Sequence, residues 1–224
     1  MPQFLAFLAL AIGLPLAIAL TGLSTWAWVG LGAAAWAVAL VIKISAGTVV
    51  SVASERFLRR PAMKAAVWGL WSGLAELGVA AILFLTVEPF PALGDTIGFG
   101  IGAGSVEVVF VLISAVASSS RGTSTEADSP GAGMDWSGVI ERALTSVGHV
   151  SSRGLVWSGV QGWCMAPAVV VALTTFGLVD GVATYGTNAK WDWHDPSVIR
   201  RFHRFLALVT VLEAVAFGVS IVLV

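Results

Sequence analysis

The apolar runs of this chain constrain its fold more than any other feature. Seven runs of about 20 residues each match the length that an α-helix needs to cross a ~30 Å hydrocarbon core. The runs are continuous rather than alternating, which argues against a transmembrane β-barrel. The expected spans are Phe4–Leu23, Trp26–Ile44, Lys64–Thr86, Asp95–Ala117, Val139–Gly162, Trp163–Tyr185 and Phe202–Val224. The sequence therefore predicts an all-α fold, a polytopic transmembrane helical bundle forming one domain over residues 1–224.

The composition agrees with a membrane protein. Of the 224 residues, 57% are hydrophobic and 11% are charged, whereas a soluble domain carries roughly 25% charged residues. The formal net charge of −1 gives no bulk attraction to nucleic acid. We therefore expect the lipid bilayer, and no nucleic acid, among the partners. No basic segment precedes the first apolar run, so we interpret it as a retained span rather than a signal peptide.

The distribution of Lys and Arg predicts the orientation in the membrane. Ten of the 12 basic residues lie in or beside alternate connections, and the other two lie inside the fifth span. The ten are Lys43, Arg56, Arg59, Arg60, Lys64, Arg121, Lys190, Arg200, Arg201 and Arg204. Because cytoplasmic loops are enriched in Lys and Arg, we expect a plasma-membrane protein with its N-terminus in the cytoplasm and its C-terminus outside.

Two connecting segments have their own character. Residues Gly47–Leu58 are too few to cross a bilayer, so we expect an interfacial or re-entrant piece there. Residues 118–138 are rich in Ser, Gly and acidic side chains, which is typical of a flexible polar linker. The predicted orientation puts this linker in the cytoplasm.

Three carboxylates fall near the centres of predicted spans: Glu76, Glu107 and Glu213. A charge at that depth costs about 2.5–3.5 kcal/mol on insertion scales unless it is paired, protonated or bound to a metal. Such residues are therefore candidates for a functional site. Glycines precede Glu107 as two GxxxG pairs, which predict either close helix packing or a locally broken helix that carries Glu107 to the site.

The fifth span adds a polar stripe. Arg142, His149 and Arg153 are separated by 7 and 4 residues, which on an ideal helix puts them within about 20° of one direction. Such a stripe should face the bundle interior. Glu141 lies beside Arg142, and we expect Asp180 of the sixth span to pair with Arg142. The whole set is acid-rich, so it must hold protons, bind a cation or be divided between sites.

The connection between the sixth and seventh spans combines aromatic, acidic and basic residues. Its composition is typical of an aromatic and basic belt at the membrane interface. A metal site formed by Asp192, His194 and Asp195 is the alternative, although their order has no characteristic spacing.

Four segments in order resemble the YhfC-type intramembrane metalloproteases, relatives of the CAAX-prenyl protease and PrsW group. The segments are GAAAWAVALVIKI (Gly32–Ile44), GIGAGSVEVV (Gly100–Val109), ERALTSVGHVSSRGLVW (Glu141–Trp157) and FGLVDGVA (Phe176–Ala183). They are similar to the family's second span, its GxGHGxxE segment, its Glu-Arg…His…Ser span and its HxxxD segment. The resemblance implies a metal held by histidines and a glutamate that activates water.

The chain departs from the family's pattern at several polar positions. The paired-glutamate motif EExxR reads Glu76-Leu77 here, with Ala80 in place of the arginine. Ala103 and Phe176 stand where the family has histidines. The polar positions that survive are Glu76, Glu107, Glu141, Arg142, His149 and Asp180. A metal site built on Glu107 and His149 would be rich in oxygen ligands, which suits Mn²⁺ or Mg²⁺ better than Zn²⁺.

Three hypotheses follow. The chain is a catalytically degenerate member of this fold that acts as a binding or scaffolding subunit with other membrane proteins, its polar residues fixing the helix packing. Alternatively, it is an active metal-dependent intramembrane peptidase, in which Glu76 and Glu107 serve as base and ligand, His149 as ligand or acid, and Arg153 stabilises the oxyanion. In the third, Glu76, Glu107 and Glu213 form a proton or ion pathway.

Overall fold

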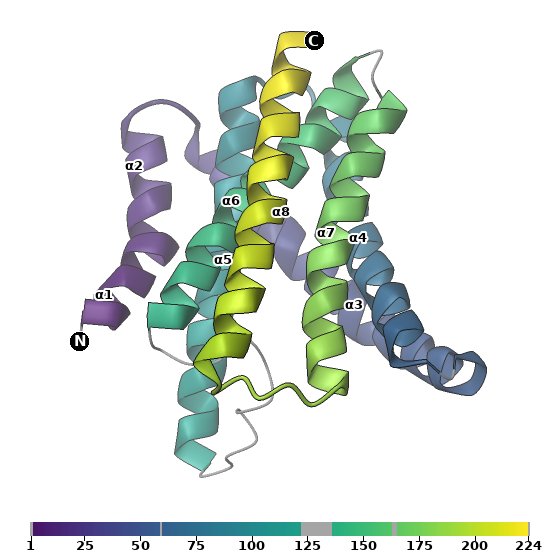
Figure 1. Ribbon diagram of the computed structural model, residues 1–224. Helices are drawn as coiled ribbons and strands as arrows, with labels where there is room; N and C mark the ends of the chain where they lie inside the picture. The colour runs from purple at the N-terminus through teal and green to yellow at the C-terminus, as the bar shows by residue number, and fades with distance from the viewer. Residues whose placement is uncertain (1, 59, 122–135, 163–164, 224) are drawn as a thin grey trace.

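The computed structural model describes residues 2–58, 60–121, 136–162 and 165–223, and every regular element in these ranges is a helix. Long helices run alternately up and down, and the two chain ends lie at opposite ends of the bundle (Figure 1). The first span is built from α1 (Pro2–Leu8), a π-helical turn η1 (Ala9–Gly13) and α2 (Leu14–Leu20). The others are α3 (Trp26–Phe57), α4 (Pro61–Thr86), α5 (Leu93–Arg121), α6 (Trp136–Gln161), α7 (Met165–Asn188) and α8 (Pro196–Leu223).

The predicted helical membrane bundle is confirmed. Among the described residues, six helical segments are long and apolar enough to cross a membrane. The seventh long helix, α6, is less apolar because it carries the polar stripe, and it packs against α4, α5, α7 and α8. Arg142, His149 and Arg153 are all buried on it. A helix this polar can cross a bilayer only inside a bundle, as the sequence predicted.

The predicted end of the second span was wrong. Helix α3 continues through Gly47 to Phe57, so the segment expected to be interfacial or re-entrant is part of one long helix. Apolar residues such as Val49 and Val52 continue the helical run, and the next proline comes only at Pro61. The predicted linker is also shorter at both ends, because α5 reaches Arg121 and α6 begins at Trp136. Its remaining residues, 122–135, lie outside the described residues.

Two glycine pairs hold α5 between α3 and α6. A Cβ atom on Gly102 would lie 1.9 Å from the carbonyl oxygen of Val29 in α3. One on Gly100 would lie 2.6 Å from the Cα atom of Val150 in α6. Close packing therefore explains these glycines, and α5 is a continuous helix rather than a broken one. The packing puts Glu107, farther along α5, opposite the polar stripe of α6.

An apolar core fills the half of the bundle nearer the C-terminus. It is formed by large side chains near the ends of α4, α6 and α8 and the start of α5: Phe84, Phe99, Leu155, Trp157 and Phe217. The Trp157 indole Nε1 donates a 2.8 Å hydrogen bond to the Pro91 carbonyl in the α4/α5 connection, which closes this end of the core. The charged residues lie on the other side of it, toward the middle of the bundle.

Candidate functional site

Glu76 of α4 is the first centre of a buried charge network. Its Oε1 accepts a 2.8 Å hydrogen bond from Lys43 Nζ of α3, and its Oε2 accepts a 2.6 Å bond from Arg153 Nη2 of α6. The Arg153 guanidinium also donates to the Ser152 hydroxyl at 3.0 Å and lies over the Phe176 ring. Glu76 and Arg153 are almost completely buried, so both of their charges depend on these partners.

His149 joins this centre to a second one on α5. Its Nε2 contacts the Oε2 of Glu107, and its Nδ1 lies 4.0 Å from the Oε2 of Glu76. The other oxygen of Glu107 accepts from Arg142, which also donates to Glu141. Glu76, Glu107 and His149 therefore lie together, with the imidazole between the two carboxylates.

Lys43 is a member of this charge network that sequence reasoning missed. It was counted among the basic residues of a cytoplasmic loop, because the second span was expected to end at Ile44. In the structure Lys43 lies well inside α3, paired with Glu76 and 3.9 Å from Asp180. The signal that could have identified it is the apolar sequence that continues past Lys43 to Val52.

The expected pairing of Asp180 with Arg142 was wrong. Arg142 lies with Glu107 and Glu141, whereas Asp180 of α7 accepts a hydrogen bond from the Ser72 hydroxyl of α4. Glu213 of α8 forms no ion pair with the arginines within 4 Å among the described residues. Its Oε1 accepts a 2.6 Å hydrogen bond from Thr175 Oγ1 of α7.

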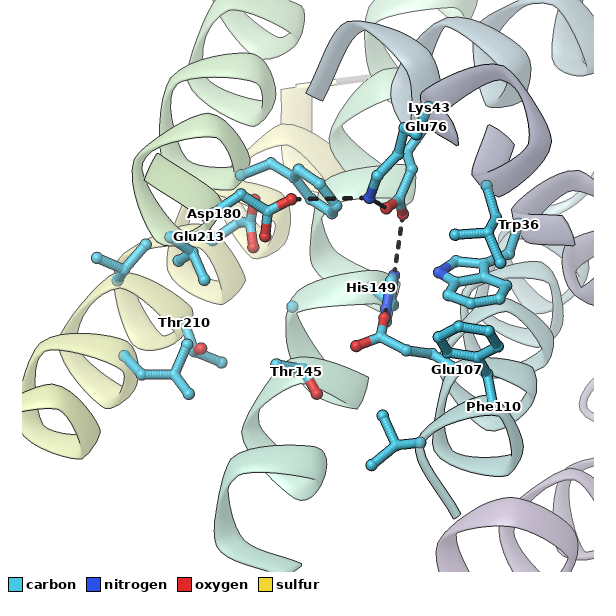
Figure 2. Close-up of a pocket in the computed structure, with 17 residues that line it drawn as sticks. Trp36, Lys43, Glu76, Glu107, Phe110, Thr145, His149, Asp180, Thr210 and Glu213 are labelled. Atoms are coloured by element: carbon cyan, nitrogen blue, oxygen red, sulfur yellow. Dashed lines mark hydrogen bonds and ion pairs between the residues drawn. The ribbon is translucent and has the colours of Figure 1, made fainter. Parts of the chain in front are cut away.

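A cavity of about 250 Å³ lies among these residues. Figure 2 shows His149 and Glu107 at its centre, Lys43 and Glu76 on one side, and Asp180 and Glu213 on another. Trp36 and Phe110 line the side opposite Asp180 and Glu213. Four carboxylates, one lysine and one histidine therefore surround a space that also has an aromatic wall.

A second, more polar cavity of about 370 Å³ adjoins the first. The two share Glu107, Thr145 and Asp180 in their walls, and the second extends to Asn188 at the end of α7. That end of α7 lies on the same side of the bundle as the N-terminus (Figure 1). The apolar core with Trp157 and Phe217 occupies the opposite direction. The second cavity therefore connects Glu107 and Asp180 with the end of the bundle where the N-terminus lies.

The residues present do not fit the predicted metal site. Within the described ranges, no group of three His, Cys, Asp or Glu side chains is placed to hold a metal ion. Glu107 and His149, the two predicted ligands, contact each other, and the second oxygen of Glu107 is held by Arg142. Ala103 is buried, and the Phe176 ring lies 6.1 Å from the His149 ring, so apolar groups fill the two positions where the resembled family has histidines.

The acidic residues between α7 and α8 serve the turn rather than a metal. Asp192 Oδ1 accepts from the His194 backbone N–H at 2.9 Å, and Asp195 Oδ1 accepts from the Ser197 backbone N–H at 2.7 Å. The hydrogen bonds from Ser197 lower the pKa of Asp195, because they favour its charged form. Asp195 thus stabilises the start of α8.

Comparisons with protein-family models, curated proteins and solved structures give no match for this chain. The functional interpretation therefore depends on the side chains of the site itself.

Proposed function

We propose that this chain is a membrane protein that binds rather than hydrolyses, a degenerate relative of the YhfC-type metalloproteases that serves as a binding or scaffolding subunit of a membrane complex. One observation carries this proposal. Every side chain that a peptidase mechanism would use already contacts another ionisable side chain of the same network. These side chains are Glu76, Glu107, His149 and Arg153.

These contacts argue against each catalytic role. A general base must accept a proton, but protonating Glu76 would leave Lys43 and Arg153 without their counter-charge in a buried place. Arg153 donates to Glu76 and Ser152 and does not line the cavity, so it is not directed at an oxyanion there. A catalytic metal usually needs three protein ligands and an open position, and cationic side chains hold the carboxylates that would provide them.

The network has a clear structural use in this reading. It connects α3, α4, α5 and α6 through groups that would be costly in lipid if unpaired. A bundle fixed in this way can present a cavity and an outer surface of constant shape to a partner.

We further propose that the protein lies in the plasma membrane with its N-terminus in the cytoplasm. The alternating helices support opposite sides for the two termini, and the α3/α4 and α7/α8 connections lie at the same end as the N-terminus (Figure 1). These two connections and the helix ends beside them hold most of the basic residues outside the helix centres.

One observation favours an active peptidase as a second candidate. His149 lies between two carboxylates beside a cavity that continues toward one end of the bundle, which is where water and a divalent metal would enter. A proton or ion pathway has less support, because the apolar core lies between the cavity and the opposite end.

Metal content and native mass separate these candidates. The chain is extracted from its native membrane into lipid nanodiscs, incubated with Mn²⁺ or Zn²⁺, washed and measured by elemental analysis and native mass spectrometry. We expect substoichiometric metal, equal in the natural chain and in Glu107→Gln, and a companion protein at fixed stoichiometry. Stoichiometric metal that Glu107→Gln abolishes, or a chain that is always isolated, would overturn the proposal.

A further inference from the structure

The central cavity has two chemically different walls. Asp180 of α7 and Glu213 of α8 lie on one side, and Trp36 of α3 and Phe110 of α5 lie on the other (Figure 2). The rings of Trp36 and Phe110 pack together, with their centroids 5.7 Å apart. Such a pairing of acids with aromatic faces is suited to a cation that carries an apolar body.

Within the acidic wall, Glu213 is the member that has no directly paired cation among the described residues. Glu76 is held by Lys43 and Arg153, but the hydrogen-bond partner of Glu213 is the neutral hydroxyl of Thr175. Glu213 is only 4% exposed, and the described residues provide it with no ion pair within 4 Å.

Among the described residues, Asp180 has only a shared and longer ion pair. It accepts from the neutral Ser72 hydroxyl, and Lys43 lies 3.9 Å away but closer to Glu76, at 2.8 Å. A cation in contact with Glu213 would therefore supply a direct counter-charge that no described residue provides to this carboxylate.

Trp36 gives independent evidence for a bound group. Its side chain is 6% exposed, and its indole Nε1 has no hydrogen-bond partner among the described residues. Figure 2 shows this nitrogen directed into the cavity, on the side of His149. A buried donor without a partner is unfavourable, so an acceptor atom in the cavity would stabilise it.

We propose that this cavity binds an organic monocation: an amine or quaternary ammonium attached to a small apolar body that carries one acceptor atom. The ammonium lies beside Asp180 and Glu213, the apolar body packs on Trp36 and Phe110, and the acceptor takes the Trp36 indole N–H. A volume of about 250 Å³ admits one ring with a short chain. The inference rests on the proposed function, since it assigns a ligand to a site that binds rather than hydrolyses.

A series of three compounds of nearly equal shape tests the charge. The protonated amine 2-phenoxyethylamine, the neutral 2-phenoxyethanol and the anion phenoxyacetate are titrated by equilibrium dialysis against the protein in nanodiscs, with empty nanodiscs as the blank. We expect the amine to bind at least roughly tenfold more tightly than the alcohol, because a charge-assisted hydrogen bond replaces a neutral one. The anion should not bind measurably above the blank.

Three variants locate the binding. Glu213→Gln should weaken the preference for the amine over the alcohol, because Asp180, which is shared with Lys43, is then the acid left beside the ammonium. Trp36→Phe should weaken both by roughly threefold to tenfold and keep the preference, because it removes only the donor to the ether oxygen. Leu212→Ala, at an exposed position next to Glu213 on α8, is the matched control and should change nothing.

The possible results are separable. Equal binding of amine and alcohol, binding that Glu213→Gln leaves unchanged, or no binding of any compound overturns the inference. Each variant's unfolding temperature is measured beside the natural chain's, so that loss of binding is compared only between folded proteins. Failure of the proposed function would be seen in a different experiment, the metal analysis, as stoichiometric metal that Glu107→Gln abolishes. That measurement uses no amine, so the two failures can be told apart.

Discussion

Substituting only one partner of the Glu76–Arg153 pair should destabilise the bundle by more than the loss of that one hydrogen bond, because the other charge is left buried without its partner. Arg153 Nη2 lies 2.6 Å from Glu76 Oε2, and two unit charges about 4 Å apart attract each other by about 4 kcal/mol at an effective dielectric of about 20. Removing one partner of a buried pair costs about 3–5 kcal/mol. Glu76→Gln should be near the upper end, because it leaves Lys43 and Arg153 without their carboxylate. Arg153→Met should be near the lower end, because Lys43 still neutralises Glu76.

The double variant decides whether the pair is formed. With Glu76→Gln and Arg153→Met combined, Lys43 keeps Asp180 as a neighbour at 3.9 Å, so little uncompensated charge is left. We expect the double variant to be more stable than the sum of the single effects implies, by about 2–3 kcal/mol. The measurement is the loss of helicity during titration with SDS in mixed micelles. A control cycle combines Arg153→Met with Glu88→Gln, at an exposed loop position, in place of Glu76→Gln. The two effects in this control should add within about 0.5 kcal/mol. Additivity in the Glu76 cycle would refute the reasoning.

Three further predictions concern packing and topology. Gly69→Ala should destabilise the bundle by about 1–3 kcal/mol in the same titration, because its Cβ would lie 2.0 Å from the Gly177 carbonyl oxygen. Gly78→Ala on the same helix has open space and should be neutral or slightly stabilising; equal effects would contradict the α4–α7 packing. Trp157→Phe should cost about 1–3 kcal/mol by leaving the Pro91 carbonyl without its donor, and an unchanged titration would mean that this bond is not made. Reporter fusions at the two termini should report opposite sides of the membrane, and the same side for both would exclude seven crossings.

Depth along the membrane normal could be predicted from the sequence. Apolar runs give the start and end of each span, so residues at similar depth are known before any helix is placed. Glu76, Glu107 and His149 were placed at similar depth for this reason, and the structure brings them into contact, which the sequence alone left open. The interior position of α6 was predictable as well, because Arg142 and Arg153 share one face that lipid would not accept.

Rotation of each helix about its own axis could not be predicted. Asp180 was expected to face Arg142 because the two have similar depth, but α7 is turned toward α4 by the contact of Gly177 with Gly69. This contact puts Asp180 beside Ser72, one turn from Gly69 on α4. Glycine contacts of this kind depend on both partners at once, and a single sequence does not identify the partner.

The end of α3 was missed for a different reason. A window of about 20 residues marks the minimum length of a span, but a tilted or protruding helix is longer. Lys43 then falls inside the helix instead of at its end, and a residue counted as a loop charge becomes the counter-ion of Glu76.

The nitrogen chemical shifts of the His149 ring test the central claim most directly. The chain has three histidines, so selective ¹⁵N-histidine labelling gives a small set of resonances, and His149→Gln assigns those of His149. The network predicts that the Nε2 resonance of His149 differs from that of the exposed His194 and moves markedly in Glu107→Gln, since Nε2 contacts the Glu107 carboxylate. A His149 resonance that matches His194 and ignores Glu107→Gln would show that the helices do not bring these groups together.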